Sequence, residues 1–109
     1  PITIGDLIFT VSNEGFLHMV EKNKGNIIRV NDLYINYKTK KRKVIKPIGF
    51  AIGDSKLYLT STDGKMMIVN LSHGNIIGSE KVSGNFASQP FIFNQNLFII
   101  KNGSIVQYN

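Results

Sequence analysis

The chain has 109 residues, which is the length of one domain, and its composition of 42% hydrophobic and 18% charged residues is typical of a folded protein. The absence of cysteine excludes a disulfide framework, a thiolate metal site and a cysteine nucleophile. A net charge of +6 fits an acidic partner, but Lys, Asn and Ile are abundant throughout, which favours a general compositional bias.

The first predicted unit covers residues 1–46 and begins at Pro1. Its central turn, residues 11–15, ends in Gly15 and is followed by an apolar strand, Phe16–Glu21. A second turn follows at Gly25. Glycine supplies the positive φ that tight hairpins require, so Gly15 and Gly25 are predicted to be structural turn residues.

The second predicted unit, residues 47–89, begins at Pro47 and repeats the same order of features. Its turn ends in Gly64, its next strand is Lys65–Asn70, and its second turn contains Gly74. The sequence Gly-Asn-Ile-Ile at residues 25–28 recurs at residues 74–77, a spacing of 49. An identity at this spacing indicates an internal repeat.

The third predicted unit, residues 90–109, begins at Pro90 and contains a turn glycine, Gly103, followed by a last strand. Each complete unit gives four short strands within 43 to 46 residues. A four-stranded antiparallel meander of this length is typical of a propeller blade. The predicted fold class is therefore all-β, a partial β-propeller with two full units and half of a third.

The order of proline, Leu-Tyr or Leu-Phe, turn glycine, apolar strand and Gly-Asn pair resembles the PQQ-like propeller repeat. This repeat occurs in quinoprotein dehydrogenases and in BamB-type outer-membrane assembly lipoproteins, and the resemblance covers nearly the whole chain. Quinoprotein repeats usually carry a tryptophan after the second glycine, where this chain has Ile28 and Ile77 and contains no tryptophan. This departure favours the BamB type.

The BamB-type resemblance implies a non-catalytic scaffold without a cofactor. It implies a periplasmic lipoprotein at the inner face of the outer membrane, which binds the barrel-forming subunit of the assembly machine and assists outer-membrane β-barrel assembly. Nucleic acid is not expected as a partner, and membrane association is expected only through an anchor outside this chain. Two alternatives stay open: a fragment of a PQQ-dependent quinoprotein dehydrogenase, or a propeller interaction domain of another family.

A propeller needs at least four blades to close, whereas this sequence predicts two and a half. The chain is therefore expected to be a C-terminal fragment of one larger propeller domain. Self-association through open strand edges is the alternative, because unpaired edge strands pair readily with other chains.

No catalytic, cofactor-binding or metal-binding residue is predicted. The two histidines lack partners at metal-ligand spacing, turn chemistry explains the aspartates, and no serine has a nucleophile-elbow context. These residues are His18, His73, Asp6, Asp32, Asp54, Asp63, Ser12, Ser61, Ser72 and Ser104.

One charge cluster stands out in the longer connection between the first two units, after Tyr34 and Tyr37. Its five bases are Lys38, Lys40, Lys41, Arg42 and Lys43. A contact with an acidic protein surface or with anionic lipid headgroups is one interpretation. A solvated loop is the other, since charge runs are common on loops.

Overall fold

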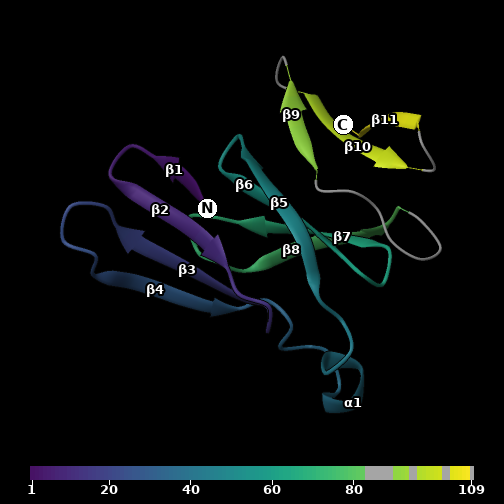
Figure 1. Ribbon diagram of the computed structural model, residues 1–109, viewed down its shortest axis with the longest axis horizontal. Coiled ribbons are helices and arrows are strands. Elements are labelled where there is room, and N and C mark those ends of the chain that lie inside the picture. Colours follow the sequence, from purple (N-terminus) through teal and green to yellow (C-terminus); the bar gives the residue numbers. More distant parts are fainter. Residues whose placement is uncertain (83–89, 94–95, 102–103, 109) are drawn as a thin grey trace. The chain divides into compact units, whose positions relative to one another are not determined.

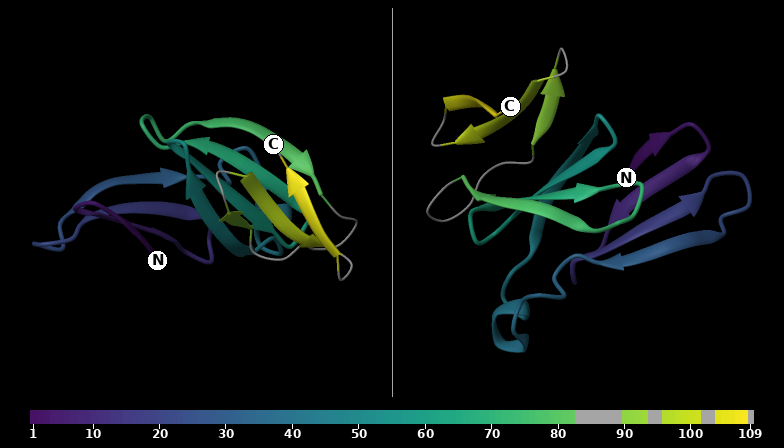
Figure 2. Two further views of the ribbon diagram at one scale, coloured as in Figure 1. Left: turned by 90° about the horizontal axis from the view of Figure 1, so that it is seen from above. Right: turned by 180° about the vertical axis from the view of Figure 1, so that it is seen from behind.

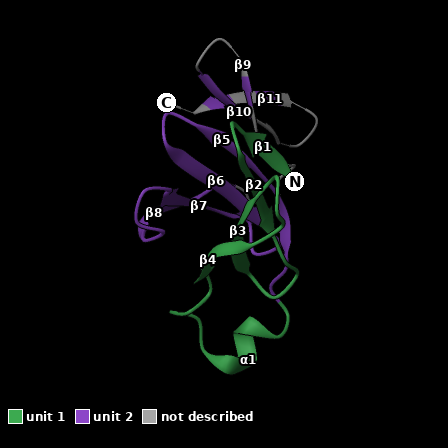
Figure 3. Cartoon of the chain, turned by 90° about the vertical axis from the view of Figure 1, so that its left-hand side faces the viewer, with its two compact units in different colours: residues 1–44 green, residues 45–109 purple. Residues whose placement is uncertain are grey.

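The computed structural model describes residues 1–82, 90–93, 96–101 and 104–108. The chain divides into two compact units, residues 1–44 and residues 45–109, which Figure 3 draws in different colours. Each unit is described separately below. Within the described residues, no helix is long and apolar enough to cross a membrane.

The first unit contains one four-stranded antiparallel sheet in which the strands follow one another in chain order (Figure 1). Its strands are β1 (Ile2–Ile4), β2 (Leu7–Val11), β3 (Phe16–Glu21) and β4 (Ile27–Asp32). This is the meander that the sequence predicts.

The second unit contains a second meander of four strands and a sheet of three. The four strands are β5 (Pro47–Gly53), β6 (Lys56–Ser61), β7 (Lys65–Asn70) and β8 (Ile76–Lys81). The three are β9 (Phe91–Phe93), β10 (Asn96–Lys101) and β11 (Ser104–Tyr108), with β10 in the middle. Figure 2 shows the twist of the strands within each sheet, the usual consequence of L-amino-acid geometry.

The two four-stranded sheets repeat at the level of single backbone hydrogen bonds. Several backbone hydrogen bonds and register shifts of the first sheet recur 49 positions later, the spacing of the Gly-Asn-Ile-Ile identity. The N–H of Lys22 donates to the carbonyl of Asp6, as the N–H of Leu71 does to that of Ser55. The N–H of Leu33 donates to the carbonyl of Gly15, as the N–H of Val82 does to that of Gly64. The strand register shifts between Met19 and Val20 and, 49 residues later, between Ile68 and Val69.

The prolines at which the first two predicted units begin, Pro1 and Pro47, do not occupy matching positions in the 49-residue backbone repeat. Pro47 is the first residue of β5, whereas Pro1 precedes β1. In the backbone register Pro1 corresponds to Phe50, which lies inside β5, and not to Pro47. The spacing of 46 between the two prolines therefore differs from the backbone repeat of 49.

The connection after β4 contains a single helical turn, α1 (Thr39–Arg42), where the sequence predicts a loop. The N–H of Arg42 donates to the carbonyl of Lys38 at 2.9 Å, and the N–H of Lys43 to that of Thr39 at 3.2 Å. Lysine and arginine have straight side chains and favour helix, and neither glycine nor proline interrupts the run. Four residues are too few for a periodic pattern to predict.

Alternating apolar side chains of the central strands form the core. Leu57 and Leu59 on β6 have no exposed surface, and Leu17 on β3 is 1% exposed. In the second unit, buried Met66 and Leu97 belong to one hydrophobic cluster that joins the four-stranded to the three-stranded sheet. A Cβ on Gly53 would collide with Cδ1 of Ile92, so β5 approaches β9 closely there.

Candidate interaction surface

The predicted turn glycines occupy left-handed backbone positions wherever the structure describes them. Their φ angles are +90° at Gly15, +71° at Gly25, +80° at Gly64 and +76° at Gly74. Gly103 lies outside the described residues. The four described glycines therefore fix the hairpins and leave the connections between sheets as the variable part.

The segment that contains the basic run begins at Leu33 and Tyr34, which are each 1% exposed. The N–H of Leu33 donates to the carbonyl of Gly15 at 2.9 Å, so the segment starts against the β2–β3 turn. A Cβ on Gly15 would lie no farther than 2.8 Å from three ring carbons of Tyr34. Glycine at this position thus lets the tyrosine ring pack directly on the backbone of the turn.

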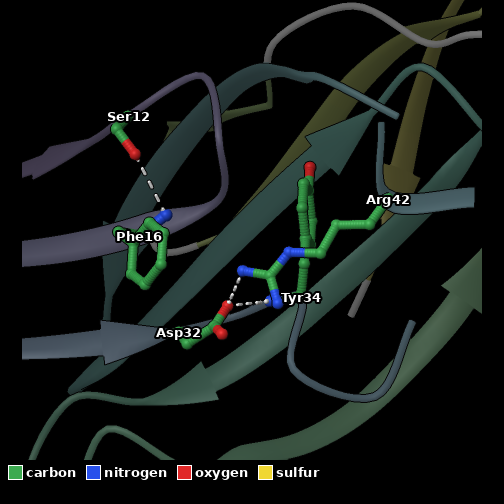
Figure 4. A network of polar contacts seen from close by, with 5 residues as sticks. All are labelled: Ser12, Phe16, Asp32, Tyr34 and Arg42. Carbon is green, nitrogen blue, oxygen red and sulfur yellow. Dashed lines mark hydrogen bonds and ion pairs between the residues drawn. The ribbon is translucent and has the colours of Figure 1, made fainter. Parts of the chain in front are cut away.

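Asp32, the last residue of β4, connects the C-terminal end of the helical turn to the sheet (Figure 4). Its Oδ1 accepts the N–H of Tyr34 at 3.2 Å and forms an ion pair with the guanidinium of Arg42. The Arg42 guanidinium carbon also lies 5.5 Å from the centre of the Phe16 ring, within cation–π range. Arg42 is therefore directed toward the sheet, where it pairs with the Asp32 carboxylate.

The four lysines of the cluster behave differently from Arg42. Lys38, Lys40, Lys41 and Lys43 are all exposed. The Lys41 ammonium lies 5.0 Å from the centre of the Tyr37 ring, which in turn lies 5.2 Å from the ring of Tyr34. The structure thus separates the predicted cluster into one structural base and four surface bases on and around α1.

The other polar residues considered from the sequence lie, where the structure describes them, on separate strands and turns. Within the described residues, no group of three or more His, Cys, Asp or Glu side chains could hold a metal ion. His18 lies on β3 and His73 is exposed in the turn after β7. The carboxylate of Asp63 accepts the N–H of Lys65 at 3.1 Å, and Asp54 has a φ of +53° in the β5–β6 turn.

No family model matches the chain, and no curated protein matches it in sequence. Several solved structures do match. Sqt1 from Saccharomyces cerevisiae is 18% identical with a TM-score of 0.71, over 94% of this chain and 27% of that one. BamB from Moraxella catarrhalis is 20% identical with a TM-score of 0.66, over 96% of this chain and 30% of that one.

The β-propeller domain of Cps50 (Swd1) from Myceliophteria thermophila is 14% identical with a TM-score of 0.69. That match covers 86% of this chain and 31% of the other. The chain is a partial β-propeller. It spans about a third or less of the length of these structures, and identities this low show the fold alone. The predicted fold class is confirmed, and each four-stranded sheet is a blade.

Sequence reasoning missed the residues that hold the basic segment on its blade. The sequence did not indicate that Asp32 and Phe16 contact Arg42, because these contacts depend on how the chain folds back after β4. Ile35 and Val44, which flank the basic run, are 66% and 72% exposed and were also missed. At the positions where quinoprotein repeats usually carry tryptophan, this chain has Ile28 on β4 and Ile77 on β8, both at the edges of their sheets. Their side chains are 54% and 48% exposed.

Proposed function

We propose that this partial propeller is a non-catalytic scaffold that binds a protein partner. The observation that carries the proposal is the exact recurrence of blade hydrogen bonds at a spacing of 49, combined with a basic connection that follows β4. Repeated blades provide a rigid support, and connections between elements carry the variable contacts. Asp54 and Asp63 lie in turns, and Asp32 forms the ion pair with Arg42.

The specific role we propose is in the assembly of outer-membrane β-barrel proteins, with the barrel-forming subunit of the assembly machine as partner and the periplasm as location. Two observations support it. The repeat resembles the BamB type and has isoleucine where quinoprotein repeats have tryptophan, and the fold is similar to BamB over 96% of this chain.

The test is direct binding between the purified protein and the purified barrel-forming subunit in detergent, measured by biolayer interferometry. We expect saturable binding with a Kd of about 1 μM or tighter, typical of a specific complex. An unrelated protein of similar size and positive charge serves as the control for charge attraction. Equal responses from the two proteins would remove the assembly role, while the scaffold proposal would then be tested with other partners.

A further inference from the structure

We propose that the segment from Ile35 to Val44, here called the α1 segment, binds the surface of a bilayer that contains anionic lipids. This proposal is independent of the protein-binding role. It rests on the charge, the exposed aliphatic residues and the anchoring of one short segment within the first unit.

The charge of the α1 segment is concentrated and has one sign. Residues 33–53 contain no acidic residue. Arg42 is paired with Asp32. The β2–β3 turn of the same blade carries one exposed acid, Glu14, so the four exposed lysines of the segment outnumber it. Each lysine close to an anionic membrane surface contributes about fivefold to the binding constant, so four give on the order of several hundredfold.

Two large aliphatic side chains accompany these lysines. Ile35 and Val44 are 66% and 72% exposed and stand on either side of α1 in the sequence. Figures 1 and 3 show α1 projecting beyond the end of its own blade, past the β2–β3 turn. Aliphatic residues among lysines suit the interface of a bilayer, where the hydrocarbon is buried and the ammonium groups remain in the headgroup layer.

The same features disfavour nucleic acid and an acidic protein surface as the partner. Single-stranded nucleic acid is bound through exposed aromatic side chains, but Tyr34 is buried and Lys41 lies over the ring of Tyr37. Ion pairs at protein and nucleic-acid interfaces favour the planar guanidinium group, and Arg42, the cluster's arginine, is turned toward Asp32. What remains exposed is lysine and aliphatic carbon.

The segment is held in place. Tyr34 packs on Gly15, and Arg42 is tied to Asp32 at the far end of the helical turn. A preorganised segment loses less conformational freedom on binding than a free loop of the same composition. The anchors therefore present the lysines as a fixed patch.

Co-sedimentation with vesicles tests the proposal. We expect binding to phosphatidylcholine vesicles that contain phosphatidylglycerol, little binding to pure phosphatidylcholine, and weaker binding as salt is raised. Lys40→Gln with Lys43→Gln should weaken binding about 25-fold. The matched control, Lys22→Gln with Lys24→Gln, removes the same charge from the turn between β3 and β4, at the opposite end of the blade, and should change binding less than about threefold.

The aliphatic contribution has its own pair of variants. Ile35→Ser with Val44→Ser should weaken vesicle binding and should do so at high salt as well, whereas Ile28→Ser on β4 should not. All the substituted side chains are exposed, so circular dichroism should show unchanged folding. Equal loss from both lysine pairs, or full competition by soluble poly-glutamate or by DNA at matched charge concentration, would overturn the proposal.

Discussion

Single residues decide how the basic segment is attached to its blade. Glycine is required at position 15 for two reasons: its φ is +90°, and the Tyr34 ring occupies the space that a Cβ would fill. Gly25 has a similar backbone, with a φ of +71°, but nothing lies within 4 Å of its hypothetical Cβ. Substitution of Gly25 therefore tests the cost of the left-handed backbone alone, whereas substitution of Gly15 adds the collision with Tyr34.

We expect Gly25→Ala to lower the free energy of unfolding by about 1 kcal/mol, the cost of a left-handed alanine. Gly15→Ala should cost about 3 kcal/mol, because the tyrosine ring must also move. Urea unfolding followed by circular dichroism measures both values. Equal losses would show that Tyr34 does not pack on Gly15.

Asp32 combines two roles that substitution can separate. Asn at this position keeps an oxygen for the N–H of Tyr34 but removes the charge that pairs with Arg42. We expect Asp32→Asn to lower stability by about 1 kcal/mol at low salt and by less at high salt, since ion pairs of partly exposed groups are weak and screened.

Asp32→Ala removes both roles and should cost about 1 kcal/mol more than Asp32→Asn. Unfolding of both variants in urea, at low and high sodium chloride, gives the comparison. Identical losses from the two variants would contradict the hydrogen bond to Tyr34, and a loss from Asp32→Asn that salt leaves unchanged would contradict the ion pair.

Among the elements, the β5–β6 hairpin carries visible backbone strain. Its two turn residues, Asp54 and Ser55, have φ angles of +53° and +61°, the pattern of a type I′ turn. Asn-Gly is the preferred pair for that turn, because both residues tolerate the left-handed region.

We expect Asp54→Asn with Ser55→Gly to raise the free energy of unfolding by about 1 kcal/mol. The control is Asn13→Gly in the β2–β3 turn, where φ is not positive and added backbone freedom should lower stability. Thermal unfolding by calorimetry compares them. A lower Tm for the double variant would mean that the turn is of another type.

Elements with a clear periodic pattern could be predicted from the sequence. The predicted strands Phe16–Glu21 and Lys65–Asn70 coincide with β3 and β7, because each combines apolar residues with a preceding turn glycine. The helical turn α1 and the contact between Asp32 and Arg42 could not be predicted. The helical turn is too short for periodicity, and the contact joins residues 10 positions apart through a path that only the folded chain defines.

At the scale of the whole molecule, the four-stranded blade occurs twice in the described residues, with the same backbone hydrogen-bond pattern but different connecting segments. Hydrogen bonds and bulges recur at a spacing of 49, while the proline starts follow a spacing of 46. The unit boundaries proposed from sequence, at residues 46 and 89, follow the prolines. The partner role proposed here depends on the blades as a support.

The most direct test of the blade repeat is the pattern of cross-strand nuclear Overhauser effects in the isotope-labelled protein. We expect backbone contacts between Phe9 and Met19 on the first blade, and between Tyr58 and Ile68 on the second, the same pairing displaced by 49 residues. A register shifted by one residue in either sheet, or strands that pair between the two sheets, would contradict the repeat and with it the proposed scaffold.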